Sequence, residues 1–213
     1  MNKPHGLLVH RSRMARDATE FAVQLLRDQI GQHVYPAHRL DRKTSGVLLF
    51  AKSKEMNSYL QEQFREQRIA KVYQAIVRGF TPQSGSIDYA LSHEDKVQEA
   101  QTDYRTLAHY ELPLPFGKFP TSRYSLVELK PYQGRFHQLR KHMAHIFHPI
   151  IGDRPHGCNK QNKLWKQHFG MTKMLLHAKT LLLTLPDGQA LQLIAPYSAT
   201  FSKVLDNLAE HKT

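Results

Sequence analysis

Cysteine and long hydrophobic runs are almost absent from this sequence. Cys158 is the only cysteine, so the chain cannot form a disulfide within itself. No apolar run approaches the roughly 18–20 residues that a membrane helix requires, and the first residues do not resemble a secretory signal peptide. We therefore expect a protein of the reducing cytoplasm, with no membrane as its partner.

Motifs that hold common cofactors and metals are also missing. Neither GxGxxG nor GxxxxGKS/T occurs, and the chain has no HExxH. Several histidines lie in or beside one predicted helix, but they do not share a face of it, and that helix has no acidic ligand. These histidines are His137, His142, His145 and His148. No pair of carboxylates stands out, which disfavours a glycosidase that works with two acids. We expect neither a cofactor nor a metal.

Acidic residues are scarce relative to basic ones. Eighteen Asp and Glu stand against 30 Lys and Arg, which gives a formal net charge of +12 and an isoelectric point near 9.8. Such an excess favours a polyanion as the partner, with an ordinary basic enzyme as the alternative. The length of 213 residues and the mean hydropathy of -0.54 are typical of one globular domain.

Hydrophobic periodicity predicts an α+β fold with a largely antiparallel mixed sheet, flanked by helices and loops around a central cleft. We expect a single domain over residues 1–213. The chain opens on turn residues, Asn2-Lys3-Pro4, so we expect a strand upstream of them to be missing. Predicted helices cover 17–31, with Asp17 as its cap and Gly31 at its end, a segment after Ser53, one from about 136, and 198–210. Predicted strands cover 46–51, 69–79, 101–111, 122–131 and a hairpin of 173–185 with 189–195, whereas 113–120 and 152–170 are predicted loops.

Arg140 is the most informative residue of the predicted helix near Phe136. The apolar residues of that helix fall on one face, and Arg140 falls inside the stripe; they are Phe136, Leu139, Met143, Ile146 and Phe147. A guanidinium is almost never buried without a carboxylate, unless it reaches past the helix end to water. Asp41, which follows a basic run, is the preferred partner of Arg140. An adjacent arginine would keep Asp41 ionised, and an ionised carboxylate shielded from water can act as a nucleophile. The alternative is an ordinary loop aspartate.

Tyr73 lies on the predicted strand 69–79. It can be a half-buried tyrosine of the sheet, or its ring can stack on a nucleobase while its hydroxyl relays a proton. The residue pattern leaves both possibilities open.

Four ordered blocks of the sequence resemble the RluA-type pseudouridine synthases. Residues 38–53 (HRLDRKTSGVLLFAKS) are similar to the family signature. Residues 2–10, 71–79 and 134–140 resemble three further family blocks in the same order, with Gln133 where Thr is more usual. The short segments 151–153 and 176–178 also match, so the resemblance spans essentially the whole chain.

The resemblance implies a reaction and a set of residues. The N1–C1′ bond of a uridine is broken, and the uracil turns and rejoins through C5, without cofactor or metal. Asp41 would be the catalytic aspartate, by attack on C1′ or through a glycal, while Tyr73 would stack on the target uracil and Arg140 would pair with the aspartate. Arg39 would enter the space left by the flipped nucleotide. Of the apolar pair Leu175 and Leu176, we assign Leu176 to pack under the base.

The expected partner is RNA, with tRNA favoured over ribosomal RNA. Residues 152–170 resemble a branch of the family that modifies tRNA in the acceptor stem, at position 65. The sequence has no S4-like RNA-binding domain, so we expect the catalytic domain, as a monomer, to bind the RNA itself. The alternatives are a catalytically idle RNA-binding protein on the same fold, and a nuclease or hydrolase, which would need a metal or a second carboxylate.

Overall fold

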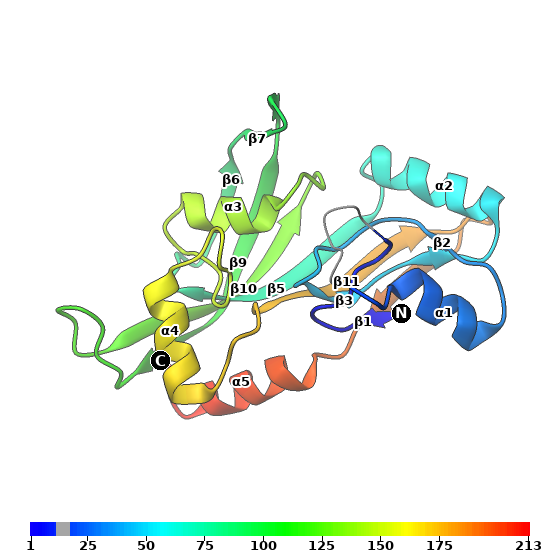
Figure 1. The fold of residues 1–213 in the computed structure, drawn as a ribbon. Coiled ribbons are helices and arrows are strands. Elements are labelled where there is room, and N and C mark those ends of the chain that lie inside the picture. Colours follow the sequence, from blue (N-terminus) through cyan, green and yellow to red (C-terminus); the bar gives the residue numbers. More distant parts are fainter. Residues whose placement is uncertain (12–17) are drawn as a thin grey trace. The chain divides into compact units, whose positions relative to one another are not determined.

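The computed structural model describes residues 1–11 and 18–213, which divide into two compact units (Figure 1). The first unit comprises Met1–Lys71 and Ala178–Pro196, and the second comprises Val72–His177 and Tyr197–Thr213. Two strands run from one unit into the other, β5 (Ala70–Arg78) and β11 (Leu176–Thr184). That the whole chain forms one catalytic domain stays a prediction.

In its described residues, the first unit contains short strands and two helices around one apolar core. Strand β3 lies between β1 and β11, β12 pairs with β11, and β2 pairs with β4, with the three pairs of known register all antiparallel. Leu60 and Ile69 belong to the core of this unit. The elements are β1 (Asn2–Lys3), α1 (Ala22–Ile30), β2 (Tyr35–Pro36), β3 (Ser45–Val47), β4 (Phe50–Ala51), α2 (Lys54–Arg65) and β12 (Ala190–Ile194).

The second unit is built on an antiparallel sheet in the order β5-β10-β9-β6. Strands β7 and β8 form a separate hairpin. The elements of this unit are β6 (Ser84–Asp88), β7 (Leu91–His93), β8 (Lys96–Gln98), β9 (Gln101–Leu112), β10 (Ser122–Pro131), α3 (Gln138–His145), α4 (Asn159–Phe169) and α5 (Ala199–Ala209).

The two faces of this sheet carry different cores, because successive side chains of a strand point to opposite faces. Ile76 of β5 packs in a cluster with Trp165 of α4 and Phe201 of α5. Its neighbour Val77 packs in another cluster with Leu139 of α3. Helix α3 therefore covers one face of the sheet, and α4 and α5 cover the other.

Most predicted elements are confirmed, and so is the α+β class with a largely antiparallel sheet. Ser53 and Ser198 cap α2 and α5, each accepting a hydrogen bond from the backbone N–H three residues later. Gly31 ends α1 with φ 64°, the left-handed conformation that favours glycine. None of the helices in the described ranges is both long and apolar enough to cross a membrane.

Four predictions of local structure need correction. Helix α1 begins only at Ala22, and its predicted cap, Asp17, lies outside the described residues. The predicted strand 46–51 is two short strands, β3 and β4, with a break between them. The predicted loop 152–170 contains α4, whose buried face carries only Gln161 and Trp165 and so lacks a clear apolar period. Asn2–Lys3, predicted as turn residues, form β1.

Candidate active site

Asp41 of the first unit lies in a tight turn just before β3. The backbone N–H of Thr44 donates to the carbonyl of Asp41 at 3.0 Å and closes this turn. Gly6 N donates to the carbonyl of Arg42 at 2.8 Å, and Arg42 Nε donates to the carbonyl of Gly6 at 3.1 Å. The Asp41 turn is therefore fastened to the start of the chain, while Asp41 itself stays half-buried.

A buried lysine supports this turn. Lys3 is fully buried, and its Nζ donates to the carbonyls of Pro4, Leu7 and Arg42 at 3.0, 2.8 and 3.1 Å. Burial lowers the pKa of Lys3 from 10.5 to about 8, and the negative charge of Asp41 opposes that shift. The Asp41 carboxylate thus interacts with a cation that belongs to the family-like segment 2–10.

His38 and Gly46 fix the two ends of the same stretch. His38 Nε2 accepts a hydrogen bond from Leu49 N at 3.1 Å, and its ring packs on Phe64. Burial lowers the pKa of His38 to about 4, so the ring is neutral at pH 7, as an accepting nitrogen requires. Gly46 has φ 113°, and a Cβ there would lie 2.1 Å from the carbonyl oxygen of Ala178, so only glycine fits.

Arg140 of the second unit is paired with a buried carboxylate. It is 4% exposed, and its Nε and Nη2 donate to Oδ2 and Oδ1 of Asp153 at 2.7 and 2.8 Å. Asp153 is buried as well, so this is a two-pronged, charge-assisted pair shielded from water. The prediction that Arg140 faces a buried acid is confirmed, with Asp153 as that acid. The pairing of Arg140 with Asp41 stays a prediction.

The predicted apolar stripe around Arg140 is right at its centre and wrong at its ends. Leu139 and Met143 are buried beside Arg140 on α3. Phe136 and Phe147 are 38% and 85% exposed. The reason is the length of α3, which begins after Phe136 and ends before Phe147, where the backbone turns to φ 65°.

The loop that carries Asp153 is held by the side chain of Asn162 and by close packing at two glycines. Asn162 of α4 accepts from Gly152 N at 2.8 Å and donates its Nδ2 to the carbonyl of Asp153 at 2.7 Å. A Cβ at Gly152 or at Gly157 would lie about 2 Å from a carbonyl oxygen, 2.1 Å from Lys173 and 1.9 Å from Asp153 respectively. These contacts leave the Asp153 backbone little freedom, so its carboxylate can orient Arg140.

Buried polar side chains attach α3 to β9. Gln138 Nε2 donates to Gln101 O at 2.9 Å and to Thr102 Oγ1 at 3.1 Å. The ring of His142 lies between Thr102 Oγ1 and the carbonyl of Tyr89, each at 3.0 Å, and burial lowers its pKa. The helix that bears Arg140 is thus fixed by hydrogen bonds as well as by packing.

Tyr73 and Leu176 meet in one cluster of the second unit. Tyr73 is half-buried on β5 and packs against the cluster that contains Leu176 and Met143 of α3. Leu175 instead packs in the cluster on the other face of the sheet, with Ile76. The structure therefore associates Leu176, and not Leu175, with Tyr73 and with the helix of Arg140.

Sequence reasoning missed residues that position the predicted ones. Asp153 had a signal, because it belongs to the family-like segment 151–153 and follows two apolar residues and a glycine. Lys3 and His38 lie in the family-like blocks 2–10 and 38–53, but no local pattern predicts their burial, because burial of a lysine or a histidine depends on the surrounding chain. Arg39 is exposed in the first unit, as a residue that contacts a partner would be.

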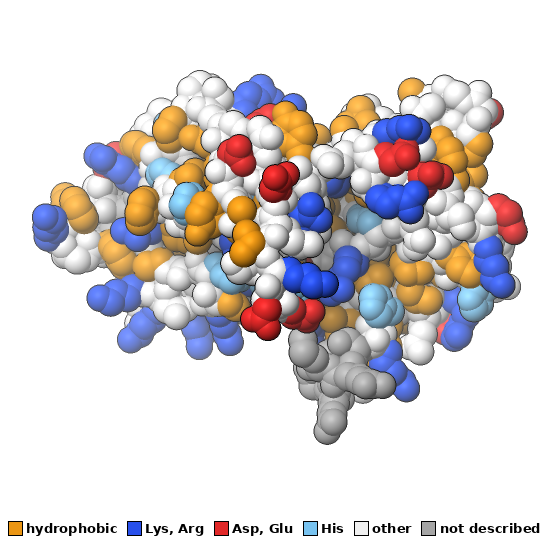
Figure 2. Space-filling model, turned by 90° about the horizontal axis from the view of Figure 1, so that it is seen from above, with side chains coloured by type: hydrophobic (Ala, Val, Ile, Leu, Met, Phe, Trp, Pro, Cys, Tyr) orange, Lys and Arg blue, Asp and Glu red, His pale blue; other side chains and the backbone are white. Residues whose placement is uncertain are grey.

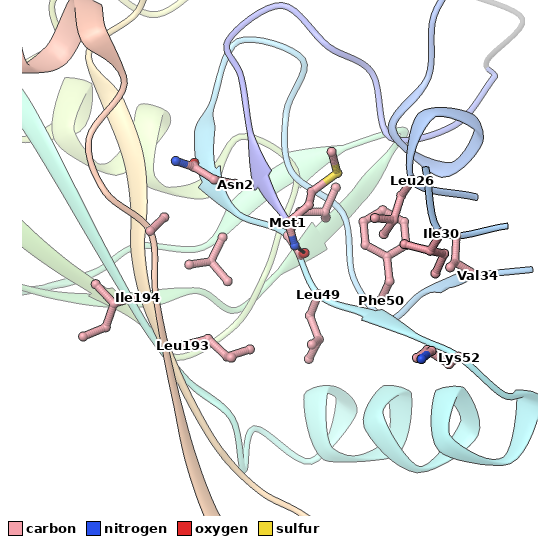
Figure 3. A pocket seen from close by; sticks show the side chains of 13 residues that line it. Met1, Asn2, Leu26, Ile30, Val34, Leu49, Phe50, Lys52, Leu193 and Ile194 are labelled. Atoms are coloured by element: carbon pink, nitrogen blue, oxygen red, sulfur yellow. Dashed lines mark hydrogen bonds between the residues drawn. The ribbon is translucent and has the colours of Figure 1, made fainter. Parts of the chain in front are cut away.

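A separate apolar pocket of the first unit does not include the predicted site residues. It has a volume of about 350 Å³ and is bordered by β1, α1 and β12 (Figure 3). Its labelled side chains are apolar apart from Asn2 and Lys52, so it offers few groups for chemistry. Within residues 1–11 and 18–213, no cluster of three or more His, Cys, Asp and Glu side chains is arranged to hold a metal.

Residues 1–145 match the RNA pseudouridylate synthase family. The chain belongs to this family. The prediction of a pseudouridine synthase, and hence of an RNA-modifying isomerase, is confirmed, and its class of substrate is RNA.

Individual relatives extend the match toward the end of the chain. The tRNA pseudouridine synthase C of Vibrio parahaemolyticus is 52% identical over 193 residues, 85% of this chain and 78% of that protein. The protein of the same name from Yersinia pestis is 50% identical over 208 residues, 92% of this chain and 81% of its own. The solved structure of human RNA Pseudouridylate Synthase Domain Containing 4 is 26% identical with a TM-score of 0.71, covering 98% and 88% of the two chains.

Proposed function

We propose that the chain converts a uridine of tRNA to pseudouridine, in the acceptor stem at position 65. Relatives named for tRNA align with 85–96% of the chain at about 50% identity. The segment 152–170, which resembles the tRNA-modifying branch, contains both Asp153 and α4. Lysine and arginine side chains are spread over the face drawn in Figure 2 and suit a polyanionic substrate.

The observation that carries this proposal is the buried ion pair of Arg140 with Asp153 and its position on α3. A guanidinium is held in a buried two-pronged pair on a helix whose apolar residues share a cluster with Tyr73 and Leu176. We assign Arg140 to the charge of the catalytic carboxylate, Tyr73 to the face of the uracil and Leu176 to the apolar support of the base.

Asp41 supplies the carboxylate that promotes cleavage of the N1–C1′ bond, and Arg39 fills the space left by the flipped nucleotide. In the reaction the N1–C1′ bond breaks, the uracil turns, and a C5–C1′ bond forms. The proton of C5 leaves to solvent, and N1 gains a proton, so atoms balance without an oxidant or a second substrate. The enzyme acts as a cytoplasmic monomer in this proposal.

Release of tritium tests this reaction. RNA with tritium at C5 of uridine should lose its label on incubation with the intact chain. Asp41→Asn should lower the rate on the order of 10³-fold or more, because it removes the reacting carboxylate. Asp28→Asn is the matched control, since Asp28 is exposed in the same unit, and it should leave the rate unchanged. Label retained by RNA with the intact enzyme would refute the proposed reaction.

The substrate assignment has its own test. Pseudouridine is mapped in total tRNA and ribosomal RNA after treatment with the enzyme. A product at position 65 of tRNA is expected, and a tRNA with cytidine at that position should yield none. A product confined to ribosomal RNA would refute the tRNA assignment while leaving the enzyme class intact.

A further inference from the structure

A small pocket beside the Asp153 loop is lined by cations and by neutral polar groups. It has a volume of about 200 Å³ and lies in the second unit, against α4. Its charged residues are Arg154, Lys163 and Lys166, and no acid lines it. The side chains of Asn159 and Asn162 and the hydroxyl of Thr172 add neutral hydrogen-bonding groups. This set of groups suits an anion.

The helix beside the pocket carries an uncompensated row of lysines. Lys160, Lys163 and Lys166 recur every three residues on α4 and are all exposed, whereas Gln161 and Trp165 anchor its opposite side. Like charges at this spacing repel one another on a helix surface. No ion pair joins these lysines to an acid in the described part of the chain, and residues 154–186 contain no Asp or Glu. These exposed lysines can therefore contact a negatively charged partner.

A second pocket, at the C-terminal end of α4, differs in charge. It has a volume of about 460 Å³ and is lined by residues of α4 and α5. Its single lysine, Lys203, is accompanied by Asp206 and Glu210. If the excess of basic residues were spread evenly, both pockets would be lined by cations alone. Only the pocket of Arg154, Lys163 and Lys166 lacks an acid, so its positive charge is a local feature.

We propose that the pocket of Arg154, Lys163 and Lys166 binds a backbone phosphate of the RNA, at a nucleotide other than the one that reacts. This inference rests on the proposed function. An arginine fork and two lysines match the charge and the oxygen acceptors of a phosphate. Contacts of this kind fix the register of a nucleic acid on a protein and carry no base preference.

The position of the pocket connects it to Arg140. Asn162 lines the pocket and also binds the backbone of Gly152 and Asp153. Asp153 in turn holds Arg140 through both carboxylate oxygens. A phosphate in the pocket therefore rests on the loop that orients the proposed catalytic arginine.

The double variant Lys163→Ala, Lys166→Ala tests the phosphate pocket. Its dissociation constant for tRNA is measured at several salt concentrations, together with KM and kcat for tritium release. The logarithm of the association constant falls as the logarithm of the salt concentration rises. Each lost phosphate contact should make this slope shallower by about one. We expect about tenfold weaker binding at moderate salt, an increase in KM and little change in kcat. The melting temperature should not fall, because the change relieves repulsion along α4.

Lys203→Ala is the matched control, since it removes a lysine from the mixed pocket on α5. It should keep both the affinity and the salt slope of the intact enzyme. The proposal is overturned if the double variant keeps them too, or if Lys203→Ala weakens binding per lysine as much as the double variant does. An intact enzyme that binds tRNA through Lys163 and Lys166 but releases no tritium would leave the phosphate pocket standing and refute only the proposed reaction.

Discussion

Among the residues that the structure describes, each unit buries one lysine or arginine, and the two cations are stabilised in different ways. Lys3 in the first unit is surrounded by three backbone carbonyls. Arg140 in the second unit is bound by both oxygens of one carboxylate. Both side chains are almost fully removed from water. The hydrogen-bond partners differ: Lys3 donates to carbonyl oxygens, which carry partial charges, whereas Arg140 donates to a carboxylate, which carries a full charge.

The two buried cations differ in whether they keep their proton as pH rises. Carbonyl dipoles do not fully offset the loss of water around an ammonium, so burial lowers the pKa of Lys3 to about 8. An arginine keeps its proton under all ordinary conditions, and Asp153 adds a full opposite charge. The second unit therefore holds a permanent charge where the reaction is proposed to need one, and the first unit holds a charge that depends on pH.

Removing the full charge beside Arg140 should have the largest effect. Asp153→Asn keeps the shape of the side chain and withdraws the negative charge, which should reduce the free energy of unfolding by about 3–5 kcal/mol. Chemical denaturation at pH 7 measures this change. Glu62→Gln, which breaks an exposed pair with Arg65, should cost less than about 1 kcal/mol. Equal effects of the two variants would remove the distinction between the buried pair and a surface pair.

Removing the adjustable charge should produce an effect that depends on pH. Lys3 binds its proton more weakly in the folded chain than in the unfolded chain. Between pH 8 and 10.5 the unfolded chain therefore holds more protons, and stability rises with pH. Relative to Lys3→Met, the native chain should gain up to about 3 kcal/mol across this window. A constant difference between the two chains over the window would contradict the lowered pKa.

Asp41 sharpens the same measurement. Its charge raises the pKa of Lys3 against the effect of burial. Asp41→Asn should therefore lower that pKa further, and the rise of stability should begin below pH 8. The measurement is the same pair of denaturation curves, with Lys3→Met, Asp41→Asn as the reference chain. If stability rises over the same pH range with and without Asp41, the charge of Asp41 does not affect the pKa of Lys3.

The two cations also explain what could be predicted from the sequence. Arg140 was predictable because helical periodicity alone places it among apolar residues. Its partner Asp153 was not, since a residue 13 positions away reaches Arg140 only after the chain has turned through a loop. Burial of Lys3 depends on carbonyls of residues 4, 7 and 42, which no local pattern encodes.

The fold follows the same division between local and distant information. Strands β9 and β10 were predictable, because each has 10 or more residues with apolar and β-branched side chains. Helix α4 was missed since its stability comes from Trp165 packing on Tyr124 and from Gln161 accepting from the same tyrosine. Those contacts join segments about 40 residues apart, so the local sequence of α4 resembles a basic loop.

The smallest expected effect concerns the residue that ties Asp153 to α4. Asn162→Ala removes two hydrogen bonds to the Asp153 loop and should cost about 1–2 kcal/mol of stability. Because the loop orients Arg140, kcat for tritium release should also fall several-fold, which a purely structural role far from the site would not produce. Asn159→Ala is the matched control, since Asn159 lines the same pocket and its side chain makes no hydrogen bond to that loop. If both variants lose kcat equally, the loss does not come from the hydrogen bonds between Asn162 and the Asp153 loop. If Asn162→Ala keeps the native kcat, the hydrogen bonds from Asn162 to the Asp153 loop have no part in positioning Arg140. The ion pair between Arg140 and the Asp153 carboxylate would then be sufficient.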